Sequence, residues 1–249
     1  MNQPHDPRRR PEVRAAEATP AEMMAAGMAM DTDATARGIF LMRVYGHLMA
    51  AIAAFILIEV WLFKAGYAVP MAEKMMSVNW MLILGGFMVS GWLARGLASR
   101  AGGKGVQYLG LGLYVAAQAV IFVPMLVIAE YYTQGGVIRS AAILTALAFT
   151  GLTLIVFQTR KDFSFLGGML RWGGVLALVA IAGAVFFGWQ LGTWFSLAMI
   201  ALAGGAILYD TSNILRYWPN DRYVGAALEL FASVALMFWY ILRLLMSRR

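Results

Sequence analysis

The chain has 249 residues, of which 61% are hydrophobic and 13% charged, and its formal net charge is +7 at pH 7. Soluble domains carry about a quarter charged residues, so this composition excludes a soluble globular domain. The basic residues are scattered through the first part of the chain and short polar gaps, without the basic stripe of a nucleic-acid-binding surface, and we expect no nucleic-acid partner. Cysteine is absent, which excludes disulfides and thiolate metal sites.

Residues 1–37 form a polar tail ahead of the first long apolar run. Acidic residues are interspersed with its arginines and no apolar run follows closely, which argues against a signal or transit peptide. The composition predicts a mostly disordered tail with a short helix at 21–30. The rest of the chain, 38–249, is predicted to form one membrane domain.

Seven apolar runs follow the tail, and each is long enough to cross the hydrocarbon core of a bilayer, about 30 Å thick, as a helix. Only a helix satisfies its own backbone donors and acceptors there, so we expect an all-α, polytopic bundle of seven transmembrane helices. A re-entrant last run is the alternative to a seventh span. The runs lie at residues 39–63, 79–98, 106–129, 137–158, 165–187, 191–214 and 223–246.

Basic residues near the ends of the runs predict the orientation, because lysine and arginine are retained on the cytoplasmic side. The tail and the second, fourth and sixth connections carry most of them: Arg37, Arg95, Arg100, Lys104, Arg160, Lys161, Arg216 and Arg222. The other side has only Lys64, Lys74 and Arg139 in or beside its loops. We therefore predict a cytoplasmic N-terminus. Seven spans then place the C-terminus outside, where its last two arginines fit the rule poorly.

Few ionisable residues lie inside the apolar runs, and each is a functional hypothesis because a charge in hydrocarbon costs several kcal/mol. Asp210 lies late in the sixth run among small residues that let another helix approach, and simple exposure to cytoplasmic water is the alternative. Glu229 lies one turn from Ser233 in the seventh run, and an interfacial glutamate is its alternative. We expect His47 to be a packed or interfacial side chain and Glu59 to face the outer headgroup region.

The sequence offers no catalytic set. Every lysine falls outside the helix cores, so a retinal Schiff base has no candidate, and no HExxH motif exists. Ser90 and Gly91 are not followed by any histidine, as an intramembrane serine protease of this kind would need. We expect no enzymatic activity.

Four segments occur in the order FLMRVYGHLMAAI, TRKDFSFLGGML, LYDTSNIL and ALELFASVALMFWYILRLL, in or between the first, fourth, sixth and seventh runs. In this combination, over about residues 38–246, the chain resembles the Bax inhibitor family, also called the transmembrane Bax inhibitor motif family, and its bacterial members. The resemblance implies a seventh helix at the centre of the other six. It also implies a pH-sensitive calcium leak and a place in the bacterial inner membrane.

The resemblance further implies roles for particular residues. In the family two aspartates, one late in the sixth helix and one in the seventh, form a pH-sensing pair, and an arginine near the end of the second helix serves as a latch. Asp210 matches the first aspartate, Ser233 stands where the second usually lies, and Arg95 matches the arginine. Glu229 could supply the missing carboxylate. Asp210 is then the principal cation ligand, with calcium as a transported ion and no resident cofactor.

Two functions are compatible with this resemblance. The first is a slow, gated cation leak in which Arg95 contacts Asp210 in the closed state. The alternative, to which some bacterial relatives are linked, is an interaction protein that regulates a membrane-anchored quality-control protease through the tail or a loop. The lipid bilayer is the surroundings in both cases.

Overall fold

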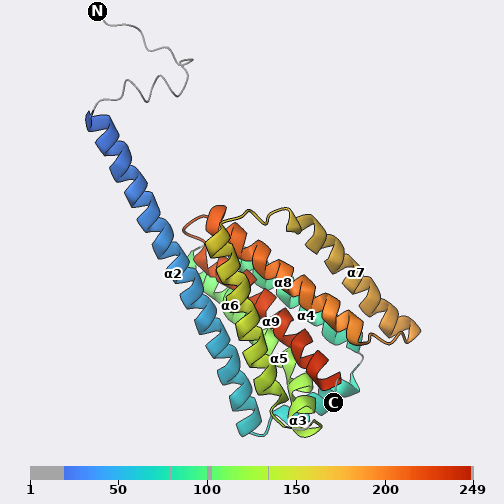
Figure 1. Cartoon of the computed structure of the whole chain (residues 1–249). Coiled ribbons are helices and arrows are strands. Elements are labelled where there is room, and N and C mark those ends of the chain that lie inside the picture. The colour runs from blue at the N-terminus through green and yellow to red at the C-terminus, as the bar shows by residue number, and fades with distance from the viewer. Residues whose placement is uncertain (1–19, 79, 100–102, 134, 248–249) are drawn as a thin grey trace, which may run out of the picture. The chain divides into compact units, whose positions relative to one another are not determined.

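The computed structural model describes residues 20–78, 80–99, 103–133 and 135–247. This part of the chain is all α-helical and contains eight helices (Figure 1). They are α2 (Pro20–Lys64), α3 (Ala68–Ser77), α4 (Trp80–Ser99), α5 (Lys104–Tyr131), α6 (Val137–Thr159), α7 (Leu166–Phe187), α8 (Thr193–Arg216) and α9 (Tyr223–Ser247). The chain divides into two compact units, Met1–Phe40 and Leu41–Arg249, and the packing described below belongs to the second.

Each of the seven predicted apolar runs is helical, in α2 and in α4 to α9. Within the described ranges, six helices are long and apolar enough to cross a membrane: Asp33–Lys64 of α2, and α5, α6, α7, α8 and α9. Helix α4, with 20 residues, covers the second predicted run and is not among these six. The chain is therefore an all-α, polytopic membrane protein, as its composition predicts.

The first helix begins earlier than the first apolar run. Helix α2 is continuous from Pro20, so residues 20–37 of the predicted tail are helical instead of disordered, and the short helix expected at 21–30 is part of α2. Residues 1–19 of the tail lie outside the described residues. Alanine and methionine are dense over 20–30, and both are strong helix formers, which accounts for the extension.

Helix α3 was not predicted, because its ten residues are too few for a membrane span. Gly66 adopts a left-handed backbone conformation with φ of 77° and ends α2, and the chain then turns into α3. Ala68 and Ala72 are buried on one face of α3 and pack with Leu62 of α2 and with Val123 of α5. The spacing of these alanines, one turn apart, is the signal of an amphipathic helix.

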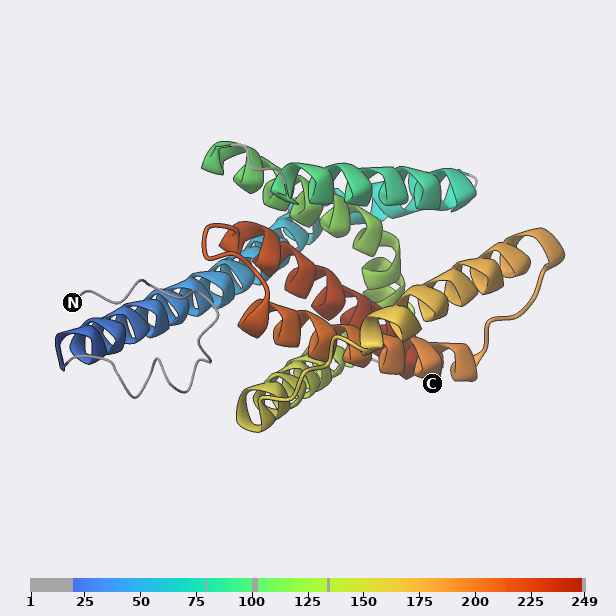
Figure 2. The same ribbon diagram turned by 90° about the horizontal axis from the view of Figure 1, so that it is seen from above.

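Helix α9 packs against α4, α5, α6 and α8 (Figures 1 and 2). Aromatic contacts fix it to α5: the Phe122 ring lies 5.6 Å from that of Phe238 and 4.9 Å from that of Trp239, centroid to centroid. Phe55 of α2 reaches the same core, 5.2 Å from Phe122 and 6.2 Å from Phe231. Helix α9, which contains the last apolar run, is one continuous helix of 25 residues. It has no interruption of the kind that a re-entrant segment requires.

The second, fourth and sixth connections meet at one end of the bundle. Lys104 donates a hydrogen bond to the carbonyl of Asp221, which joins the second connection to the sixth. Arg216, at the end of α8, donates to the carbonyl of Arg160 in the fourth connection. Far along α9, Arg243 donates to the carbonyl of Leu191 in the fifth connection at 2.7 Å, so the end of α9 lies beside that connection. The connections predicted to share the cytoplasmic side therefore lie together.

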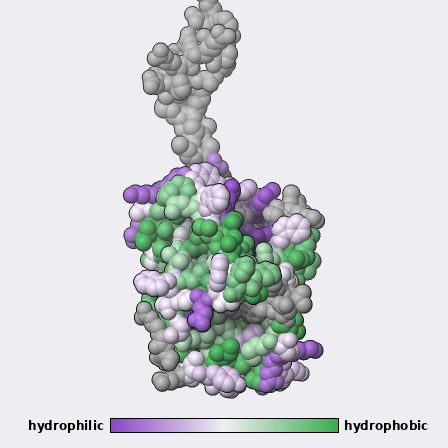
Figure 3. All heavy atoms as spheres, turned by 90° about the vertical axis from the view of Figure 1, so that its right-hand side faces the viewer, coloured by the Kyte–Doolittle hydropathy of each residue, from purple (hydrophilic) through white to green (hydrophobic). Residues whose placement is uncertain are grey.

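Large apolar side chains cover much of the outer surface. Helix α7 shows this most clearly, because Met169, Trp172, Leu176 and Val179 recur at helical spacing and are all exposed. Figure 3 shows the side of the molecule that faces right in Figure 1, with hydrophobic residues prominent between the two ends and hydrophilic residues gathered mostly near them. An exposed apolar surface of this extent is what lipid contact requires.

Glu59 corrects one sequence-based expectation. The prediction placed it in the outer headgroup region, yet its side chain is only 6% exposed. Its neighbours Ile58 and Leu62 belong to the cluster that α2 forms with α3 and α5. The unpredicted helix α3 therefore packs at the level where the sequence suggested lipid headgroups. Neither carboxylate oxygen of Glu59 has a hydrogen-bond partner among the described residues.

Candidate functional site

Asp210 and Ser233 face each other across the α8–α9 interface. The Ser233 hydroxyl donates a hydrogen bond of 2.6 Å to Oδ2 of Asp210, and the serine is 7% exposed. Small residues make this approach possible, since Gly204 and Ala203 are buried on the same stretch of α8. The position opposite Asp210 is therefore filled by a hydroxyl that can donate a hydrogen bond, where the resemblance implies a second carboxylate in other members.

Arg95 of α4 pairs with Glu229 of α9, with 3.1 Å between Nε and Oε2. This differs from the expectation drawn from the sequence, in which Arg95 contacts Asp210. Glu229 precedes Ser233 by one turn, so the ion pair and the Asp210–Ser233 hydrogen bond lie on neighbouring turns of α9. The side chains of Arg95 and Glu229 are 47% and 32% exposed, which makes the pair accessible and not sealed in the core.

Tyr114 and Gln118 of α5 complete the surroundings of the arginine, and sequence reasoning missed both. The Arg95 guanidinium lies over the Tyr114 ring, 5.6 Å from its centroid. Gln118 Nε2 donates a 3.0 Å hydrogen bond to the Tyr114 hydroxyl, one turn away on the same helix. Both side chains are buried. The only sequence signal was a glutamine one turn from a tyrosine inside an apolar run.

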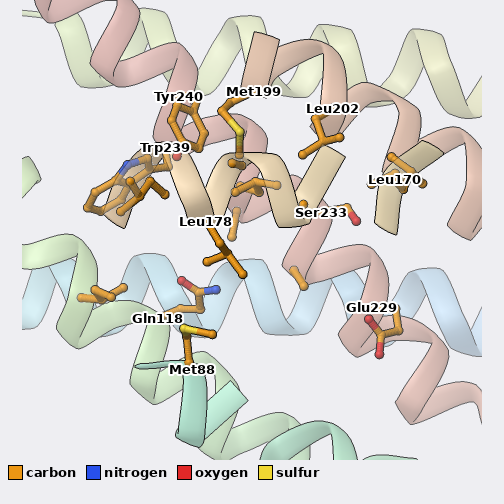
Figure 4. Close-up of a pocket in the computed structure, with 18 of the residues that line it drawn as sticks. Met88, Gln118, Leu170, Leu178, Met199, Leu202, Glu229, Ser233, Trp239 and Tyr240 are labelled. Carbon is orange, nitrogen blue, oxygen red and sulfur yellow. The ribbon is translucent and has the colours of Figure 1, made fainter. Parts of the chain in front are cut away.

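The four residues that were predicted from the sequence to form the site line one cavity of about 1380 Å³. They are Arg95, Asp210, Glu229 and Ser233. Helices α4, α5, α7, α8 and α9 form its walls, and they contribute Arg95, Tyr114, Leu178, Asp210 and Glu229, respectively, among others. In Figure 4, Glu229 and Ser233 lie toward one side of the cavity and Trp239 and Tyr240 toward the other. The polar cluster of Arg95, Asp210, Glu229 and Ser233 is therefore gathered in one part of a larger space.

The rest of the cavity is mostly apolar. Leu178, Met199, Leu202 and Trp239 are among its lining residues (Figure 4). The lining extends along α9 from Glu229 to Arg243, about 20 Å at 1.5 Å per residue. Arg171 and Arg243 are the other charged residues among those that line the cavity.

The polar cluster is too sparse for a resident metal. No group of three or more His, Asp or Glu side chains suited to a metal ion occurs in the described part of the chain. Calcium takes six to eight oxygen ligands, whereas this cluster offers two carboxylates, one of them paired with an arginine. The role of Asp210 as a cation ligand stays a prediction.

The fold and this site define a polytopic α-helical membrane protein with a partly exposed polar cluster where α4 meets its last two helices. The family model described as "Inhibitor of apoptosis-promoting Bax1" matches residues 37–249. The chain belongs to this family, the Bax inhibitor family, as its sequence motifs indicated. It is a membrane protein of that family.

Several curated proteins are similar to part of the chain. "Modulator of FtsH protease YccA" of Escherichia coli K12 is 38% identical over 113 residues, 45% of this chain and 51% of that protein. "Inner membrane protein YccA" of Escherichia coli O6:H1 matches over the same shares at the same identity. "Protein LIFEGUARD 4" of Arabidopsis thaliana is 34% identical over 144 residues, 55% of this chain and 56% of that protein. The chain thus spans about half the length of the curated relatives it matches.

Proposed function

We propose that the protein is an inner-membrane interaction protein that regulates a membrane-anchored quality-control protease. The observation that carries this proposal is the similarity to a bacterial relative whose name denotes a modulator of such a protease. The name of a second relative supports placement in the inner membrane. We further infer seven spans, with α4 as the second and α9 in the middle, a cytoplasmic N-terminus, and residues 1–37 as the partner-binding segment.

Co-purification of the protease with the full-length chain and with a variant lacking residues 1–37 tests this proposal. We expect the full chain to retain the protease and the truncated chain to lose it, while both remain in the membrane. Asp210→Asn is the matched control, because this change lies in the polar cluster and should leave the partner bound. Failure of the full chain to retain the protease contradicts the proposal.

The inferred orientation has its own test, which the absence of native cysteine makes simple. Gly103 and Gly135 lie in exposed connections, and a Cβ at either would meet nothing within 4 Å. We expect an impermeant thiol reagent added to intact cells to label Gly135→Cys and to spare Gly103→Cys. The reverse pattern contradicts a cytoplasmic N-terminus.

A slow cation leak controlled by protons, with calcium as the transported ion, is a second candidate function. The observation that favours it is the placement of Asp210, Ser233, Glu229 and Arg95 around one cavity. In this proposal the Asp210–Ser233 hydrogen bond and the Arg95–Glu229 ion pair hold α4, α8 and α9 together in a closed state. Protonation of Glu229 weakens its contact with Arg95, and protonation of Asp210 weakens the hydrogen bond that it accepts from Ser233. Either change loosens the closed state and opens the path.

Calcium flux into proteoliposomes, measured as a function of pH against protein-free liposomes, tests the leak. We expect Asp210→Asn to flatten the pH dependence and Arg95→Ala to raise flux at neutral pH. Ser233→Asp restores a second carboxylate and should change the pH profile by adding a coupled titration. Absence of flux at every pH, or an unchanged profile in Asp210→Asn, contradicts this candidate.

A further inference from the structure

A cluster of basic and aromatic residues, separate from the polar cluster in the cavity, lies where α2, α5 and α9 approach one another. The Arg43 guanidinium lies 5.4 Å from the centroid of the Tyr223 ring, and Nζ of Lys104 lies 4.2 Å from the same centroid. The His47 ring packs against the same tyrosine, 5.0 Å from the Tyr223 ring and 5.5 Å from that of Tyr108. Three helices distant in sequence thus bring two cations to one aromatic ring.

His47 makes two hydrogen bonds within this cluster. Its Nδ1 lies 2.6 Å from the carbonyl of Arg43, and a carbonyl only accepts, so this nitrogen carries a proton. Its Nε2 lies 2.9 Å from the hydroxyl of Tyr108, which can donate to it. The fixed positive charges of the cluster are those of Arg43 and Lys104.

These two cations are accessible and form no ion pair in the described part of the chain. The side chains of Arg43 and Lys104 are both exposed, and neither forms an ion pair with a carboxylate in the described part of the chain. Lys104 donates to the backbone carbonyl of Asp221, a neutral acceptor. Asp221 is exposed in the same connection, and its single negative charge is outnumbered by the two cations. The cluster keeps a net positive charge.

The surroundings place this charge at a lipid boundary. Lys104 and Tyr223 are the first residues of α5 and α9, two candidate spans, so they lie where the apolar segments begin. Exposed apolar side chains adjoin the cluster along the same helices, with Met49 on α2 and Leu109 on α5 exposed by 61% and 68%. An anionic phospholipid has a negatively charged headgroup and apolar acyl chains. A positively charged cluster beside an apolar protein surface is complementary to both parts.

We propose that Arg43 and Lys104 bind the phosphate headgroup of an anionic phospholipid whose acyl chains lie along α2 and α5. Guanidinium and ammonium groups donate charge-assisted hydrogen bonds to phosphate oxygens. A tyrosine side chain has an apolar ring and a polar hydroxyl, so tyrosine is favoured in the headgroup region of a bilayer. The cluster contains two tyrosines. The site is independent of the protease and leak proposals, because none of its residues lines the cavity.

Native mass spectrometry of the full-length protein in detergent, titrated with dioctanoyl phosphatidylglycerol, tests the proposal. Dioctanoyl phosphatidylcholine and inorganic phosphate are titrated in parallel. We expect the wild type to bind phosphatidylglycerol most tightly. The double variant Arg43→Gln/Lys104→Gln should lose roughly twentyfold in affinity, because each basic residue near an anionic surface contributes about fivefold. Lys64→Gln/Arg139→Gln, which removes two charges from other connections, should bind as the wild type does.

The charge-conserving variant Arg43→Lys/Lys104→Arg should retain the preference for phosphatidylglycerol, and it keeps the test decisive if the neutral variant folds poorly. Equal binding of phosphatidylglycerol and phosphatidylcholine overturns the proposal. So does an equal loss of affinity in the Lys64/Arg139 variant. Binding of inorganic phosphate as tight as that of the lipid makes this a free-phosphate site and likewise overturns it.

Discussion

At the residue scale, Glu59 is a buried carboxylate without a hydrogen-bond partner among the described residues. An unpaired polar group that is buried costs about 1–3 kcal/mol, more when it is charged. We expect Glu59→Met, which keeps the length of the side chain and removes its polar atoms, to raise the midpoint of thermal unfolding. About 2–4 °C is expected for each kcal/mol gained in a chain of this size.

Glu130→Met is the matched control for Glu59→Met, because Glu130 is exposed near the end of α5 and its replacement should not stabilise the protein. Scanning fluorimetry in one detergent measures both variants. A lower midpoint for Glu59→Met than for the wild type would mean that the carboxylate makes a stabilising interaction.

Double-mutant cycles measure whether Arg95 interacts more strongly with Glu229 or with Asp210. We expect Arg95→Gln and Glu229→Gln to couple by about 0.5–1 kcal/mol in the free energy of unfolding, since both side chains are partly exposed. The coupling between Arg95→Gln and Asp210→Asn should be smaller, because Asp210 is bonded to Ser233. A larger coupling to Asp210 contradicts the pairing described here.

Part of this site was predictable from the sequence. A carboxylate inside an apolar run can be recognised in the sequence as a candidate site residue, because a charge in lipid is costly. The family resemblance placed Ser233 opposite Asp210. The partner of Arg95 was not predictable in the same way. Asp210 and Glu229 lie on different helices, and matching depth in the bilayer does not say which helix is the lateral neighbour. In the structure α4 packs against α5 and α9, which brings Arg95 to Glu229.

At the scale of elements, the packing of α4 against α5 depends on Gly110. A Cβ added there would lie 2.7 Å from the Ala94 carbonyl oxygen and 2.8 Å from the Ala98 nitrogen, both backbone atoms of α4. The backbone atoms of a helix cannot move away from an added methyl group unless the whole helix shifts. Gly110→Ala should therefore destabilise the protein by about 1–3 kcal/mol. The measurement is the free energy of unfolding.

Gly112→Ala is the control for Gly110→Ala, because a Cβ at Gly112 would meet nothing within 4 Å. This variant should be as stable as the wild type or slightly more stable, since alanine favours helix. Equal destabilisation by both changes would show that loss of glycine itself, and not the close approach of α4, is responsible.

The fourth connection is fastened to the end of α8 by hydrogen bonds outside the spans. The Tyr217 hydroxyl donates to Asp162 Oδ2 at 2.6 Å, and the Ser164 amide donates to Oδ1 at 2.8 Å. The Tyr217 bond first, and then the Ser164 amide, lower the pKa of Asp162 below its ordinary value. The stabilisation is therefore present above the ordinary aspartate pKa, about 4, and is lost as the pH falls through the lowered pKa.

Tyr217→Phe removes this bond and should lower the midpoint of thermal unfolding at neutral pH. The difference from the wild type should shrink as the pH is lowered through the pKa of Asp162, because the protonated acid no longer attracts the hydroxyl as strongly. Unfolding midpoints of both proteins across an acid pH series measure this. A difference that stays constant down to the lowest pH contradicts a role for the carboxylate.

The extent of the helices was largely predictable, because a membrane span requires a long apolar run and short polar gaps separate such runs. Helix α3 failed that criterion by its length and was missed, although Ala68 and Ala72 carry its amphipathic signal. The early start of α2 was missed because the polar composition of the tail was given more weight than the helix propensity of residues 20–30.

At the scale of the whole molecule, the part from Leu41 onward combines a lipid-exposed apolar surface with a polar cluster at the packing of its last two helices. Three basic connections gather at one end, which suits an end that meets cytoplasmic partners and anionic lipid headgroups. Regulation of a protease requires that this chain change the rate at which the protease acts, not only that the two proteins associate.

The rate at which the reconstituted membrane-anchored protease degrades a membrane-protein substrate is therefore the most direct test. It is measured in proteoliposomes with and without the full-length chain at equal lipid composition. Our account predicts that adding the chain changes this rate in proportion to its amount, that the variant lacking residues 1–37 does not, and that Asp210→Asn acts as the wild type does. An unchanged degradation rate at every amount of the full-length chain would contradict it.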